Sequence, residues 1–207
     1  MGTTGLHGAW WVWPLALVLY GVFRAWYDNW RGPLRTAEID ALIARAEQAP
    51  GARHTDLQVL RRFMETDDGK EFVMQNLVRY RPKALYPEGH HFGDDPREAD
   101  KRYGKSIIGD LLRYGNLVIF IARKTGDFVK PEGADAWHYV AMVRYRSRRD
   151  FVRFATRANQ AEKFMHKWAA IEKTHVFPVK PIISLVAVRT LVALSLFTIG
   201  LLVTRLM

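Results

Sequence analysis

Two predicted strands place side chains that could move a proton or hold an anion on one face of a sheet. Residues 71–80 and 137–146 both have strand character, and Val-Arg-Tyr-Arg occurs at 78–81 and again at 143–146. Alternation along the strands puts His138, Arg79 and Arg144 on the same face. An imidazole titrates near neutral pH, and a guanidinium can stabilise an anionic or enolate oxygen. The pattern predicts a ligand pocket in which His138 is the candidate catalytic residue.

The rest of this face completes the predicted pocket. Gln75 and Met142 join Arg79 and Arg144 as candidate ligand-binding residues, because a mixture of apolar and polar groups is typical of such sites. A competing interpretation makes the face a dimer interface whose arginines pair with carboxylates. The other face is nearly all apolar and is expected to pack beneath helices; its one amide, Asn76, is expected to satisfy a buried backbone group.

The sequence predicts no metal site and names no cofactor. With no cysteine, the chain excludes a thiolate zinc site, an iron–sulfur cluster and a cysteine nucleophile. Glu172-x-x-His175 is only half of a di-iron ligand set. Phosphate-binding, serine-hydrolase and dinucleotide motifs are also missing. The segment at 81–97 is expected to be a solvated loop. Its potential metal ligands follow no standard spacing: His90, His91, Asp94 and Asp95.

The elements that would position these side chains follow one another in a recognisable order. After two short helices, the patterns predict a strand at 71–80, a helix at 98–114, strands at 117–124 and 137–146, helical sequence at 147–173 and a strand at 175–179. This β-α-β-β-α-β order predicts an α+β, ferredoxin-like domain, with an antiparallel sheet and two helices on one face. In this topology the strands at 71–80 and 137–146 are central neighbours.

Several stretches carry a family resemblance over roughly residues 70–180. They are FVMQNLVRYRP, a helix running from Tyr103 to Leu111-Leu112-x-x-Gly115, WHYVAMVRYRSRRDFVRFA and HKWAAIEKTHVFPV. The chain resembles the dimeric α/β-barrel superfamily, nearest to its small uncharacterised domains and more distantly to antibiotic-biosynthesis monooxygenases. The resemblance implies a homodimer that pairs two sheets around a pocket. Some members convert aromatic substrates and others bind haem, but no catalytic signature is carried over.

Both ends of the chain are predicted to be membrane helices. Residues 9–30 begin with an uncharged apolar run and carry interfacial tryptophans; a cleaved signal peptide is the alternative, but no basic start or small-residue cleavage site is present. Residues 182–203 are long enough to span a bilayer and contain one charge, Arg189. An intramembrane arginine is a candidate functional residue, unless it simply reaches the nearer headgroups.

The distribution of basic residues predicts how the protein is oriented in the membrane and which partner its surface could bind. Lys plus Arg is 31 and Asp plus Glu is 21, which gives a net charge of +10. The basic residues near the segment ends lie on the middle side, so the domain is expected in the cytoplasm, at a bacterial inner membrane. A plain solvated surface is the first interpretation of an arginine run, and anionic headgroups are its expected partner, ahead of nucleic acid. The run comprises Arg148, Arg149, Arg153 and Arg157.

Two functions are compatible with this organisation of a helix at 9–30, a helical linker at 31–69, a domain at 70–180 and a helix at 182–203. The first is a membrane-anchored domain that binds, and could convert, a small lipophilic or aromatic molecule. The second is a non-catalytic accessory or scaffolding subunit of a larger membrane assembly. The lack of a catalytic signature leaves open whether the protein is an enzyme.

Overall fold

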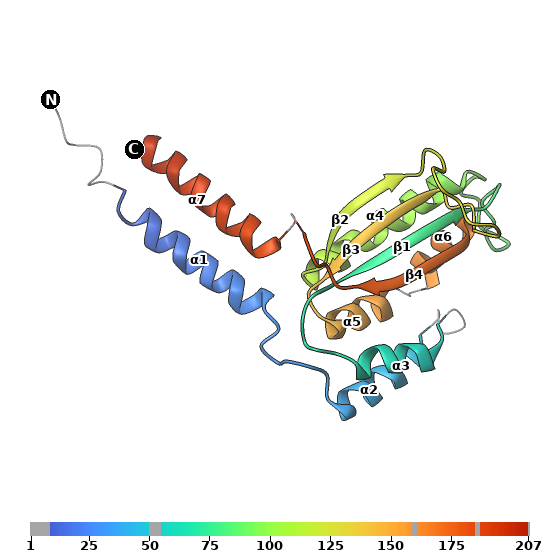
Figure 1. Cartoon of the computed structure of the whole chain (residues 1–207), viewed down its shortest axis with the longest axis horizontal. Helices are drawn as coiled ribbons and strands as arrows, with labels where there is room; N and C mark the ends of the chain where they lie inside the picture. The colour runs from blue at the N-terminus through green and yellow to red at the C-terminus, as the bar shows by residue number, and fades with distance from the viewer. Residues whose placement is uncertain (1–8, 50–54, 159–160, 185–186, 207) are drawn as a thin grey trace. The chain divides into compact units, whose positions relative to one another are not determined.

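The chain folds into two units. The computed structural model describes residues 9–49, 55–158, 161–184 and 187–206. One unit is Arg31–Pro181, and the other combines Met1–Trp30 with Ile182–Met207. The first is a mixed α+β domain and the second holds two helices, α1 (Val12–Tyr27) and α7 (Val188–Leu206) (Figure 1).

A four-stranded antiparallel sheet forms the centre of the α+β unit. Its strands are β1 (Phe72–Tyr80), β2 (Leu117–Arg123), β3 (Tyr139–Tyr145) and β4 (Ile171–Val179), in the spatial order β2-β3-β1-β4. As expected, β1 and β3 are central neighbours, with Asn76 opposite Ala141. The strand β4 lies at an edge, which suits Pro178 because proline has no N–H to donate. It begins earlier than the predicted strand at 175–179.

Three helices of the α+β unit are α4 (Pro96–Arg113), α5 (Arg148–Ala158) and α6 (Ala161–Ala170). The start of α4 is fixed by Asp95, whose side chain accepts the N–H of Arg97 at 2.8 Å. Ser147 caps α5 as expected, accepting the N–H of Asp150 at 3.1 Å. The predicted helix break near Asn159 falls outside the described residues.

One face of the sheet packs against these helices. Phe72 and Met74 of β1 and Tyr145 of β3 form a core with α4 and α5 residues, among them Leu111 and Phe154. A second core joins the far ends of the strands to α6: Val78, Ala84, Ala99, Ala169, Ala170 and Ile171. Strand alternation explains this, because Phe72, Met74 and Val78 point the same way.

The segment expected as a helical linker is packed into the α+β unit. It forms α2 (Thr36–Glu47) and α3 (Leu57–Glu65), which share a core with Val152 of α5. The spacing Thr55-x-x-Gln58 predicts Thr55 as the cap of α3. Instead Asp56 caps the helix, accepting the N–H of Gln58 at 2.9 Å. This packing makes the helix pair a structural part of the domain.

The two terminal helices pack against each other within their own unit. Trp13 of α1 contacts Phe197 of α7, with ring centroids 5.5 Å apart. A Cβ on Gly200 would lie 3.1 Å from the Trp13 ring, so glycine permits this approach. By length and composition α7 could cross a membrane, whereas α1 is apolar but shorter.

Arg189, the predicted intramembrane cation, has a carboxylate partner. Its Nε lies 2.7 Å from Oδ1 of Asp28, and its guanidinium lies 5.1 Å from the centre of the Tyr27 ring. Charges in apolar surroundings are stable only when they are paired. Arg189 therefore joins the start of α7 to the end of α1.

Candidate functional site

A large cavity lies between the sheet and α4, on the face that the sequence analysis assigned to packing. Its volume is about 860 Å³, and its walls come from all four strands and from α4, α5 and α6. The face expected to be apolar is therefore apolar, but helices fill only part of it. Alternation predicts which side chains share a face, and it does not predict how closely a helix approaches along that face.

The predicted ligand-binding residues lie on the opposite face of the sheet and do not border this cavity, so a pocket formed by them stays a prediction. Gln75 and Met142 sit side by side in the β1–β3 pair. Arg79 Nε lies 3.1 Å from a carboxylate oxygen of Glu172. Arg144 is only 5% exposed, and its Nη1 lies 2.7 Å from Oε1 of Glu71. Both arginines make the structural ion pairs that the competing interpretation expected.

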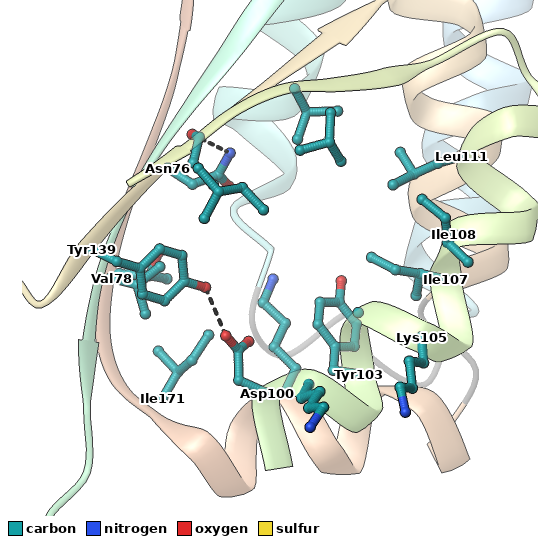
Figure 2. A pocket seen from close by; sticks show the side chains of 18 of the residues that line it. Asn76, Val78, Asp100, Tyr103, Lys105, Ile107, Ile108, Leu111, Tyr139 and Ile171 are labelled. Atoms are coloured by element: carbon teal, nitrogen blue, oxygen red, sulfur yellow. Dashed lines mark hydrogen bonds between the residues drawn. The ribbon is translucent and has the colours of Figure 1, made fainter. Parts of the chain in front are cut away.

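Most of the cavity wall is apolar. Figure 2 shows isoleucine and leucine side chains of α4 facing the strands across the open space. Asn76 also borders the cavity, and its amide donates to the carbonyl oxygens of Met74 at 3.1 Å and Ala141 at 3.4 Å. The expectation that Asn76 satisfies backbone groups is confirmed. The apolar residues along the wall include Val78, Ile107, Ile108, Leu111, Val118, Ala141 and Val143.

A carboxylate held by two tyrosines forms the polar centre of the site. Oδ2 of Asp100 accepts the hydroxyl of Tyr80 at 2.8 Å. It also accepts that of Tyr139 at 3.0 Å (Figure 2). Burial raises the pKa of Asp100, although both tyrosine hydrogen bonds act in the opposite direction. Burial also raises the pKa of Tyr80 and of Tyr139, so both remain O–H donors at neutral pH.

A lysine from α6 adds a cation beside this centre. The ammonium of half-buried Lys167 lies 5.7 Å from the ring centre of Tyr103 and 5.3 Å from that of Trp168. Burial lowers the pKa of Lys167, and the nearby Asp100 opposes this shift. In Figure 2 the hydroxyl of Tyr103 points into the cavity. A carboxylate, an ammonium and phenol groups in one apolar cavity can orient a polar group of a ligand and can transfer a proton.

His138 is the one predicted site residue that borders the cavity. Its Nδ1 accepts the backbone N–H of Tyr80 at 2.9 Å, and its ring stacks with that of Tyr80 at 5.8 Å. A protonated Nδ1 could not accept this bond, so the contact favours the neutral ring with its proton on Nε2. His138 thus supports the backbone next to the Tyr80–Asp100 bond, and its catalytic role stays a prediction.

The arginine run is used mainly within the domain. Arg149 is 3% exposed and its Nη2 lies 3.0 Å from Oε2 of Glu38, so it is unavailable to headgroups. Arg148 hydrogen-bonds the hydroxyl of Thr66 at 2.6 Å, and Arg157 pairs with Asp110 at 2.9 Å. The remaining member, Arg153, is half-buried.

The potential metal ligands of the loop at 81–97 do not converge. No group of three or more histidine or acidic side chains suited to a metal ion occurs in the part of the chain that the structure describes. His90 instead stacks on Phe92, with ring centroids 6.0 Å apart.

The sequence analysis missed Asp100 and Lys167, although each carries a signal. Asp100 precedes Tyr103 by three residues and Ile107 by seven, so it belongs to the apolar stripe of the predicted helix 98–114. Lys167 likewise follows Phe164 by three residues on α6, so it lies on the same helix face as that buried ring. A charged residue within an apolar helix stripe indicates a buried polar site.

Comparison with known proteins provides structural neighbours without an assigned activity. No protein-family model and no curated protein matches the chain. Two crystal structures are similar, one of RPA0582, a protein of unknown function from Rhodopseudomonas palustris, and one of methylated RPA0582. Both are 26% identical to this chain, with TM-scores of 0.55 and 0.56; they cover 63% and 64% of this chain and 96% of their own. The likeness therefore supports a shared domain fold.

Proposed function

We propose that the protein is a membrane-anchored domain that binds a small lipophilic or aromatic molecule in the cavity beneath α4. The cavity itself carries this proposal: about 860 Å³ of mostly apolar space with a few convergent polar groups. This volume lies within the range of about 300–1,000 Å³ that is typical of small-molecule sites. The polar end of the cavity, formed by Lys167, Tyr103 and the Asp100 group, would meet the polar group of the ligand.

Conversion of the ligand is an extension of this proposal. Asp100 is the group best suited to take a proton, because burial raises its pKa and two tyrosines fix its Oδ2. The other oxygen, Oδ1, would be the one that meets the ligand. Lys167 would stabilise negative charge that develops on the ligand after proton transfer.

We also propose a ferredoxin-like fold of the dimeric α/β-barrel type for the α+β unit. The strand order β2-β3-β1-β4 and the placement of helices on one face support this assignment. The other face of the sheet contributes no residue to the core clusters of the described chain. It carries Leu77, Val140 and Met142, and pairing with the same face of a second copy would cover these apolar groups.

Anchoring by both terminal helices is part of the proposal. The length of α7, the apolar surface of α1 and their mutual contact support a two-helix anchor. We propose a cytoplasmic domain from the basic residues that flank both segments on the middle side. Half-buried Arg153 and exposed Arg157 remain candidates for contact with anionic headgroups.

Native mass spectrometry of the full chain, gently extracted from its own membrane, tests the proposal. We expect a homodimer that carries a defined small-molecule mass. A bare protein that also fails to take up added naphthyl compounds would refute ligand binding. A stoichiometric protein partner without a small molecule would instead favour the second candidate, a scaffolding subunit, which the apolar open face of the sheet supports.

A further inference from the structure

The charged groups around the cavity are strongly biased toward one sign. Among the residues that line it, Asp100 is the only acidic one. Five basic side chains also border it: Arg97, Lys101, Lys105, Arg123 and Lys167. Lys101 pairs with Glu98 at 3.3 Å. Within the described chain, Arg97, Arg123 and Lys167 have no carboxylate at ion-pair distance.

These cations occupy two levels of the cavity. Arg97 and Arg123 are exposed, so they lie where the cavity opens to solvent, whereas Lys167 is half-buried among aromatic rings. Exposed cations at an opening attract anions from solution. A desolvated ammonium whose counter-ion is not in direct contact is costly, and an anion placed beside it would offset part of that cost.

Asp100 does not supply this counter-ion at close range. Its Oδ2 is already shared by two tyrosine hydroxyls, and no ion pair joins it to Lys167. The hydroxyl of Tyr103 faces the cavity beside Lys167 and can donate a hydrogen bond to the same ligand atom.

We propose that the cavity selects an apolar acid, with an aryl or acyl carboxylate whose anionic end binds Lys167 and Tyr103 and whose apolar part lies against α4. This inference rests on the proposed function, because it names the chemical class of the ligand for the same cavity. The apolar walls accept the hydrocarbon part of the ligand. The excess of positive charge favours an anion over a neutral molecule of the same shape.

Two isosteric probes separate the charge from the shape. We would titrate 2-naphthoate and 2-naphthamide at pH 7.5 into the full chain in nanodiscs of zwitterionic lipid and measure binding by calorimetry. Wild type should bind the carboxylate roughly tenfold more tightly or better, as expected for a hydrogen bond between charged groups. Equal affinities would overturn the inference and leave the proposed function intact. Binding of neither probe would refute both.

A matched pair of variants identifies the cation. Lys167→Met keeps the apolar stem and should abolish the preference for the carboxylate. Lys163→Met makes the same change on the same helix, where the amine pairs with Asp110 at 2.6 Å outside the cavity, and should retain the preference. Arg157 still pairs with Asp110 at 2.9 Å in that control. A preference that survives Lys167→Met would also overturn the inference.

Discussion

Filling the cavity from the sheet side should remove ligand binding without destabilising the domain. Ala141 borders the cavity at the middle of β3, opposite Asn76 of β1. A strand directs its side chains perpendicular to the sheet, so Ala141→Phe points its ring into the space beneath α4. In a filled core such a substitution costs about 1–3 kcal/mol of stability through overpacking.

Here the substitution has about 860 Å³ of space available. The new ring would lie against Ile107 and other apolar wall groups, and burial of a phenylalanine stabilises by about 1.5–3 kcal/mol relative to its exposure. Imperfect packing offsets part of this gain. We therefore expect the free energy of unfolding to stay equal or to rise by about 1 kcal/mol, while the affinity for 2-naphthoate falls at least roughly tenfold.

Urea unfolding of the full chain in nanodiscs, followed by fluorescence, measures the first quantity, and calorimetry measures the second. Ala122→Phe is the control, because it makes the same change on β2, where Ala122 lies opposite Val140 on the other face of the sheet. It should keep the affinity. Destabilisation by Ala141→Phe of about 1–3 kcal/mol would mean that the space is filled in the protein, and unchanged affinity would place the ligand elsewhere; either result would refute the reasoning.

Three further predictions concern buried charges. Arg149→Met should reduce the free energy of unfolding by about 3 kcal/mol, because it breaks a buried ion pair with Glu38; a loss below about 1 kcal/mol in urea unfolding would show the pair to be dispensable. Asp100→Asn should cause no loss of stability at pH 7. Since burial raises the folded-state pKa of Asp100, its stabilising contribution is present below the unfolded pKa and is lost as pH rises through the folded pKa. Unfolding measured from pH 2 to 8 should show this decline in wild type and a smaller one in the variant. The pKa of Asp110 is lowered: burial acts to raise it, but the bonds from Lys163 and Arg157 outweigh this effect. Its contribution is therefore lost as pH falls below the unfolded value, and Asp110→Asn should flatten the acid side of the same profile; an unchanged slope would contradict this.

Periodicity predicted the elements of this domain well because they bury regular stripes. The alternation of Phe72, Met74 and Val78 correctly identified the face that meets the helices, and Ser147 correctly marked the start of α5. Strand β4 was predicted too short, because its first residues follow α6 without a turn signal. The contact between the segment at 31–69 and α5 depends on packing and on the Arg149–Glu38 pair, neither of which is a local pattern.

The candidate site was harder to predict than the fold. Arg79 and Arg144 share one sheet face but lie at opposite ends of the β1–β3 pair. Their partners, Glu172 and Glu71, come from positions in the chain that spacing does not reveal. The cavity arises from the distance between α4 and the sheet, which is a tertiary property. The informative local signal was instead Asp100, a carboxylate in an otherwise apolar helix stripe.

The central claim is that the space beneath α4 is where the ligand binds, and isoleucine-methyl NMR of the full chain in nanodiscs tests it most directly. Ile107, Ile108 and Ile121 border the cavity, whereas Ile39 and Ile43 lie in the core of α2. Addition of 2-naphthoate should shift the methyl signals of the first three and leave those of the last two unchanged. Shifts confined to residues outside the cavity, or no shift at saturating probe, would contradict the account.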